Sequence, residues 1–178
     1  MIYVCPQCCG SGLSIDTNEK CDLCHGQKTI VLQPAEVEVK VRYHTPDLIR
    51  MEKIEKGDWI DLRAAQDVVL EKGKQHLIPL GISVQLPENF EAHVVPRSGA
   101  YKNFKIIQTN STGIIDESYC GNDDQWMMPV YAFEDGWIEK NDRICQFKIV
   151  KKMPPIRFTE VDKLTNQNRN GFSSTGVK

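Results

Sequence analysis

Two Cys-x-x-Cys pairs lie near the start of the chain, in the segments CPQCCGSG and CDLCHGQK. Each pair places two thiolates on one tight turn, and two such turns supply the tetrahedral sulfur set that Zn²⁺ prefers. No export signal precedes them, so metal binding explains this cluster better than disulfides do. The predicted zinc ligands are Cys5, Cys8, Cys21 and Cys24, with the neighbouring Cys9 and His25 as weaker alternatives.

Three arginines, Arg97, Arg143 and Arg169, lie in short polar blocks further along the chain. The planar guanidinium group matches phosphate oxygens, although a structural ion pair is the favoured interpretation of Arg143. The formal net charge is only -2, so any phosphate ligand must be bound by local groups. The same blocks contain neutral hydrogen-bond donors, which are Ser98, Gln146, Ser174 and Thr175.

Two aspartates are candidates for chemistry beside such a ligand. Asp116 follows Gly113-Ile-Ile, so apolar residues can anchor a hairpin while the carboxylate faces a cleft and orients a water molecule. Asp61 is either an outer-shell anchor for Mg²⁺ or a structural carboxylate bonded to an arginine or to the backbone. The sequence leaves these two roles of Asp61 equally open.

Short alternating runs of polar and apolar residues indicate the elements that position these groups. Such runs are typical of half-buried strands, and many short strands bounded by turn residues predict an all-β sandwich or barrel. Cys120 and Cys145 stand apart from the cysteine pairs and are expected to be small apolar core residues. The predicted strands are 36–43, 78–86, 91–95, 105–108, 126–133 and 143–150, and 47–56 and 98–103 could each hold a short helix.

The chain of 178 residues is long enough for one ordinary domain and a small appendage. We predict a four-cysteine zinc module over 1–33, a β domain over 34–165, and a flexible tail over 166–178 that is rich in Asn, Gly, Ser and Thr. No apolar run has the length of a membrane span, and no secretion signal is evident at Met1. A cytoplasmic protein is therefore expected.

Five ordered blocks resemble the motifs of the trimeric dUTPase family, in a compact form similar to that of Gram-positive bacteria and their phages. They are GDWIDLRAA (57–65), PRSG (96–99), NSTGIIDESYCGN (110–122), DRICQ (142–146) and RNGFSSTG (169–176). The resemblance implies a jelly-roll-like β fold and a homotrimer with shared active sites. It also implies Mg²⁺-dependent hydrolysis of dUTP to dUMP and pyrophosphate.

The resemblance further implies a role for each site residue. Asp116 would activate the water that attacks the α-phosphorus, and Tyr119 would lie beneath the sugar and exclude a ribose 2′-hydroxyl. The backbone around Gly113 would bind uracil, with Asn110 at the pocket edge, and Phe172 would cover the base as a lid. The implied substrate-binding set is Arg97, Ser98, Gly99, Asn110, Gly113, Ile115, Tyr119, Gln146, Arg169, Phe172, Ser174 and Thr175.

Several positions depart from the family pattern. The last block is shortened, so that either Arg169 or Gln167 occupies the position that would meet the γ-phosphate; we favour the arginine. Ser118 replaces a residue that is often acidic, and Cys145 replaces one that is usually alanine. Neither change is expected to abolish activity.

Two other functions are compatible with parts of the sequence. A dCTP deaminase shares the β fold and the PRS block, although GIIDESY favours dUTP hydrolysis. The cysteine pairs also resemble half of the Cys-rich module of DnaJ-type chaperones, which indicates metal binding rather than chaperone activity. In the second alternative the module binds a protein or a nucleic acid in a phage regulatory protein, although a structural cap on the trimer is the favoured role of the module. Nucleic-acid binding is not expected, because only Lys20 and Lys28 supply positive charge there.

Overall fold

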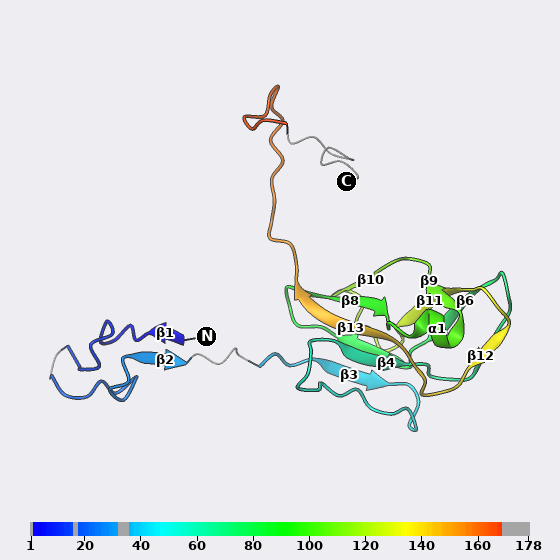
Figure 1. Ribbon diagram of the computed structural model, residues 1–178, viewed down its shortest axis with the longest axis horizontal. Helices are drawn as coiled ribbons and strands as arrows, with labels where there is room; N and C mark the ends of the chain where they lie inside the picture. Colours follow the sequence, from blue (N-terminus) through cyan, green and yellow to red (C-terminus); the bar gives the residue numbers. More distant parts are fainter. Residues whose placement is uncertain (1, 16–17, 32–35, 169–178) are drawn as a thin grey trace, which may run out of the picture.

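The computed structural model describes residues 2–15, 18–31 and 36–168. Their regular structure is almost entirely β strand (Figure 1), which confirms the all-β prediction. The elements are β1 (Ile2–Val4), β2 (Thr29–Val31), β3 (Lys40–Tyr43), β4 (Ile60–Arg63), β5 (Val68–Leu70), β6 (Gln75–Pro79), β7 (Ile82–Gln85), β8 (Phe90–Pro96), α1 (Ala100–Phe104), β9 (Ile106–Gln108), β10 (Gly113–Asp116), β11 (Met127–Ala132), β12 (Gly136–Ile138) and β13 (Arg143–Lys151).

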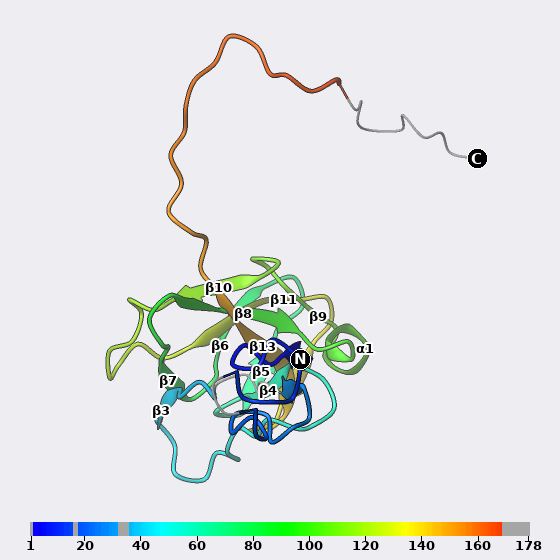
Figure 2. The same cartoon turned by 90° about the vertical axis from the view of Figure 1, so that its left-hand side faces the viewer.

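The β domain is built from two larger sheets and two strand pairs. One sheet has the order β10-β8-β13-β4 and the other has the order β6-β11-β9, with antiparallel neighbours throughout. The pairs β12-β5 and β3-β7 complete the domain. Figures 1 and 2 show these sheets gathered in one body, with α1 beside β9. The long strand β13 lies between β8 and β4, so its motif residue Gln146 pairs with residues of both strands.

The core forms where strands of the two larger sheets turn their apolar side chains inward. In β11, Met128, Val130 and Ala132 are buried while the residues that alternate with them are half-buried, as period-two alternation requires. Trp126, which precedes β11, is fully buried and packs edge-to-face against Phe147 of β13, with 5.3 Å between ring centroids. This aromatic contact joins the two sheets.

The predicted strand over 78–86 is two strands, β6 and β7, which pair with different partners. Gly81 separates them with a φ of +69°, a conformation that disfavours residues with a Cβ. A Cβ at Gly81 would lie 2.8 Å from side-chain carbons of Ala65 and Leu48. The turn therefore requires glycine, and hydropathy alone does not reveal it.

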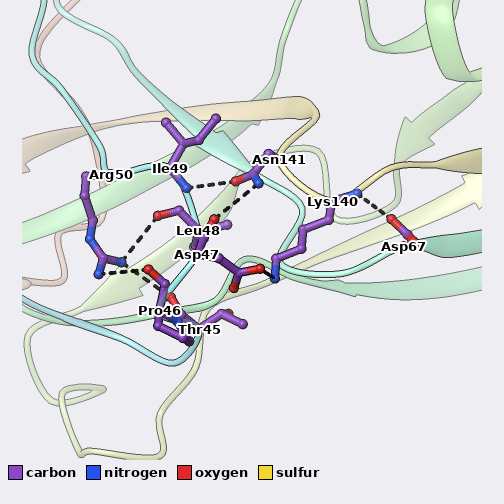
Figure 3. A network of polar contacts seen from close by, with 9 residues as sticks. All are labelled: Thr45, Pro46, Asp47, Leu48, Ile49, Arg50, Asp67, Lys140 and Asn141. Carbon is purple, nitrogen blue, oxygen red and sulfur yellow. Dashed lines mark hydrogen bonds and ion pairs between the residues drawn. The ribbon is translucent and has the colours of Figure 1, made fainter.

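The segment 47–56 does not form the short helix that the sequence allowed. Its backbone bonds to a distant turn instead, because Ile49 donates its N–H to Oδ1 of Asn141 at 2.8 Å (Figure 3). Nδ2 of Asn141 donates to the carbonyl of Asp47, and Lys140 forms an ion pair with the Asp47 carboxylate. These long-range contacts replace the bonds of a helix. The other short helix that the sequence allowed, over 98–103, overlaps the observed α1 (Ala100–Phe104).

The two ends of the chain extend from this body. The strands β1 and β2 belong to the cysteine-rich segment, which lies at the opposite end of the view in Figure 1 from β12. After β13, residues 153–168 run away from the sheets in both views, and they expose Met153, Phe158 and Leu164. No helix among the described residues is long and apolar enough to cross a membrane.

Candidate active site and metal centre

The four predicted zinc ligands come together in a single cluster. The Sγ atoms of Cys5 and Cys21 are 3.7 Å apart, as are those of Cys8 and Cys24, and all four lie within 4.8 Å of one another. A Zn–S bond of about 2.3 Å would place the sulfurs of a tetrahedral site about 3.8 Å apart. The spacing therefore fits one zinc ion, and it is too long for disulfide bonds.

Apart from this cluster, the described part of the cysteine-rich segment has no apolar core. Before residue 30, the buried hydrophobic side chains of the described residues are Cys5, Cys8, Cys21 and Cys24, whereas Ile2 and Ile15 are exposed. The backbone N–H of Gly12 donates to Sγ of Cys8 at 3.3 Å. Although burial opposes it, hydrogen bonds from the backbone of Gly12 and Gly10 and from the neighbouring thiols of Cys5 and Cys24 lower the pKa of Cys8. These contacts favour the thiolate, which is the form that binds a metal.

Asp116 lies at the end of β10, on a groove of about 380 Å³. Its exposed carboxylate accepts hydrogen bonds from both the hydroxyl and the backbone N–H of Ser118. These two bonds, together with the charge of Lys152, hold the pKa of Asp116 below its usual value. The carboxylate is thus kept ionised in a position from which it can orient a water molecule. The groove is lined by Ile114, Ile115, Asp116, Tyr119, Gln125, Trp126 and Met127.

The loop after β10 is held by contacts that the sequence did not indicate. Glu117 accepts a hydrogen bond from the backbone of Asn89 at 2.7 Å and forms an ion pair with Lys152 at 2.9 Å. The Tyr119 hydroxyl donates to the carbonyl of Gln125 at 3.2 Å, and the ring is 43% exposed. Tyr119 thereby lies on the same groove as Asp116.

A second groove, of about 300 Å³, contains the polar residues of three other motifs. Asp61 is clamped between two arginines: Arg97 lies 2.8 Å from one carboxylate oxygen, and Arg143 lies 3.1 Å from the other. Gln146 of β13 pairs with Asp61 of β4 in the sheet and lines the same groove. The groove is lined by Glu52, Ile54, Lys56, Gly57, Trp59, Asp61, Arg97 and Gln146.

These two grooves share no lining residue and lie toward opposite ends of strand β8. Asp116 pairs with Glu91 near the start of β8, whereas Arg97 directly follows its end at Pro96. At about 3.3 Å per residue, the backbones of Asp116 and Arg97 are separated by roughly 20 Å along the strand. One chain therefore does not bring all the predicted site residues together.

Gly113 and Asn110 lie beside a buried amide that the sequence analysis missed. Gly113 starts β10 opposite Val94 of β8, and Nδ2 of Asn110 lies 3.6 Å from the position of a Cβ on Gly113. Nε2 of Gln108 lies at the same distance from that position. No sequence motif singles out Gln108. The available signal was its position in β9, because Gln108 lies on the same buried face of the strand as Ile106, where an apolar residue is expected.

The remaining predicted residues fall into three groups. Ser98 is exposed and Gly99 is the N-cap of α1, while Ile115 packs against the core. Cys145 is buried as predicted, but the same expectation for Cys120 is wrong, because Cys120 lies exposed in the loop after β10. The predicted tail residues Arg169, Phe172, Ser174 and Thr175 lie outside the described residues, as does the predicted lid after residue 168.

Comparison with known proteins identifies the family. The family model described as dUTPase matches residues 58–176. This chain belongs to the dUTPase family. It is 55% identical over 142 residues to the SPbeta prophage-derived deoxyuridine 5′-triphosphate nucleotidohydrolase of Bacillus subtilis, covering 80% of this chain and 100% of that protein. It is 34% identical over 145 residues to the deoxyuridine 5′-triphosphate nucleotidohydrolase of Clostridium acetobutylicum, covering 80% of this chain and 99% of that protein.

Solved dUTPase structures share the fold at low sequence identity. A mutant dUTPase of Staphylococcus bacteriophage 80alpha with dUpNHpp superimposes with a TM-score of 0.65 at 21% identity, covering 79% of this chain and 99% of that one. A mutant dUTPase of phage phi11 of S. aureus, which coordinates a structural Mg(II) ion, gives 0.61 at 19% identity, covering 71% and 97%. At these identities the likeness establishes the fold of the dUTPase domain.

Proposed function

We propose that this chain hydrolyses dUTP to dUMP and pyrophosphate. The observation that carries the proposal is the ionised carboxylate of Asp116, which lies with Tyr119 on one groove inside the region matched by the dUTPase family. Asp116 acts as the general base that orients and deprotonates the attacking water. Tyr119 packs beneath the sugar, where its ring leaves no room for a 2′-hydroxyl. The relatives named as deoxyuridine triphosphate nucleotidohydrolases support the same substrate.

The phosphate chain binds in the second groove. Arg97 and Gln146 offer donors there, and Ser98 lies next to Arg97 in the chain. Asp61 forms ion pairs with both Arg97 and Arg143, which supports a role in orienting these two arginines. The same carboxylate is the proposed outer-shell anchor for Mg²⁺. When bound with the substrate phosphates, Mg²⁺ would neutralise charge on the leaving pyrophosphate. Arg169, Ser174 and Thr175 are proposed to close over the phosphates, and Phe172 over the base.

The active enzyme is proposed to be a homotrimer in which neighbouring chains complete each site. Its support is the separation of roughly 20 Å between Asp116 and Arg97, which is too long for one chain to place both on a single substrate. The exposed Met153, Phe158 and Leu164 of the segment after β13 also favour packing against a second copy.

The segment 1–33 is proposed to be a structural zinc module, the 34–165 region the dUTPase domain, and 166–178 the lid. The spacing and burial of Cys5, Cys8, Cys21 and Cys24 support one zinc ion per chain. The Bacillus relative is matched over its full length by 80% of this chain, which supports a module separate from catalysis. We propose that the module serves as a structural cap on the trimer, with binding of a protein partner as the alternative.

One substrate panel tests the proposed activity. Release of pyrophosphate is measured from dUTP, dCTP, dTTP and UTP in the presence of Mg²⁺. We expect dUTP to be by far the best substrate, with UTP excluded by Tyr119. Release of ammonia from dCTP without pyrophosphate would identify a deaminase instead. If none of the four nucleotides reacts, the proposed activity is wrong.

A further inference from the structure

Gln108, at the end of β9, is one of the two buried polar side chains in the described part of the β domain, with 8% of its surface exposed. Burying an amide is unfavourable unless its hydrogen bonds are made. Its Nε2 donates to the carbonyl oxygen of Val94 at 3.1 Å and to Oδ1 of Asn110 at 2.8 Å. The residue therefore connects the strand β8 to the turn before β10.

These two bonds fix the orientation of both amides. The Val94 carbonyl can only accept, so it selects the NH₂ end of Gln108 over the oxygen end. The second N–H of that group then points to Asn110, and this selects Oδ1 of Asn110. The pole of Asn110 that remains for a ligand is the donor Nδ2. Turning either amide over would place two acceptors or two donors against each other.

This relay ends beside the backbone that is proposed to bind the base. Nδ2 of Asn110 and Nε2 of Gln108 each lie 3.6 Å from the position of a Cβ on Gly113. Asn110 is exposed, in contrast to Gln108. The Gln108 oxygen Oε1 is buried without a hydrogen-bond partner among the described residues, so the amide is retained despite an unsatisfied acceptor.

We propose that Gln108 is a positioning residue that locks Asn110 with its N–H donor toward the base and so favours uracil over cytosine. Uracil presents a carbonyl oxygen at ring position 4, where cytosine presents an amino group. A locked donor pairs with the first and opposes the second, whereas a freely rotating Asn110 could turn its oxygen to meet cytosine. This proposal rests on the proposed dUTP hydrolysis and deepens it.

The test compares kcat/KM for dUTP and dCTP in the full chain and in Gln108→Met. Methionine keeps the length and volume of the side chain but removes both donors. We expect the dUTP/dCTP ratio to fall by about tenfold or more, because that factor corresponds to about 1.4 kcal/mol of lost discrimination. Ile107→Met, on the exposed side of the same strand, should leave the ratio unchanged. A folded Gln108→Met with the wild-type ratio overturns the proposal.

A double-variant cycle separates positioning from simple packing. If Gln108 acts through Asn110, Gln108→Met should not change the ratio further in an Asn110→Ala background. A change that persists there assigns the effect to packing and overturns the proposal. If Gln108→Met does not fold, Asn110→Asp provides the answer: it keeps an acceptor for Gln108 and turns a second acceptor to the base.

The ratio in Asn110→Asp should therefore move toward dCTP, and a ratio that does not move overturns the proposal. The wild-type measurement separates a failure of the proposed dUTP hydrolysis from a failure of the proposed role of Gln108. If the wild-type protein does not prefer dUTP, the proposed function fails. If it does prefer dUTP and the variants keep that preference, only the role of Gln108 fails.

Discussion

The backbone N–H of Ser118 donates to Oδ1 of Asp116 at 2.7 Å, and the Ser118 hydroxyl donates to the same oxygen. Both bonds stabilise the ionised form, so the pKa of Asp116 lies below its ordinary value. A general base with a lowered pKa remains active at lower pH than an unassisted carboxylate. Ser118 thus has a definite electrostatic effect on Asp116.

Ser118→Ala should shift the acidic limb of the pH profile of kcat/KM to higher pH. The substitution removes the hydroxyl donor, so the pKa of Asp116 rises and the base is protonated earlier as the pH falls. Activity near neutral pH should change little. Ser118→Thr retains a hydroxyl and serves as the control. An acidic limb that stays in place in the alanine variant contradicts this account. Asp116→Asn should lower turnover by about 10²–10⁴ at neutral pH, where the wild-type carboxylate is ionised.

Two inactive variants should restore activity when their subunits are mixed. Asp116→Asn and Arg97→Met should each disable every site of the proposed homotrimer, but a mixed trimer can combine Asp116 of one chain with Arg97 of another. A random one-to-one mixture should recover about a quarter of the wild-type activity, since each mixed trimer contains one intact site. Subunit exchange is followed by mass spectrometry. Mixed trimers without activity would show that the two residues act within the same chain.

Purified full-length protein should contain one zinc ion per chain, measured by elemental analysis. Cys24→Ser should lose the ion and expose residues 1–33 to limited proteolysis, because the four buried thiols are the only core that the described part of this segment has. Cys9→Ser is the matched control, since Cys9 is exposed and lies outside the cluster. Zinc that remains bound in Cys24→Ser would refute the assignment. Unfolding of the β domain and dUTP hydrolysis should be unchanged in both variants.

Asn141→Ala should lower the free energy of unfolding by about 1–3 kcal/mol. Asn141 has a φ of +72°, and its side chain bonds to the backbone of Ile49 and Asp47 (Figure 3). Asn141→Gly loses the same side-chain bonds but accepts the positive φ without strain, so it should be less destabilising than alanine. Urea unfolding measures both variants. Equal losses would mean that the backbone conformation contributes nothing.

The sequence by itself determined the family, the spacing of the four clustered cysteines and the all-β class. These properties depend on short-range patterns, since a Cys-x-x-Cys turn, a motif such as PRSG and a period-two strand are each complete within a few residues. Asp116, Tyr119, Arg97 and Gln146 were all visible in this way. The two-strand break at Gly81 was not, because the steric need for glycine comes from Leu48 and Ala65, which are distant in the sequence.

The tertiary structure decided which of these residues meet. It places Asp61 between Arg97 and Arg143, although Asp61 lies 36 and 82 residues before these two arginines in the chain. It joins Gln108 to both Val94 and Asn110 by hydrogen bonds. It also puts Asp116 and Arg97 at opposite ends of β8. Such relationships depend on strand order and register, and many different pairings are compatible with the same alternation of apolar residues. The folded chain selects one pairing, and in it Trp126 and Phe147 are buried against each other.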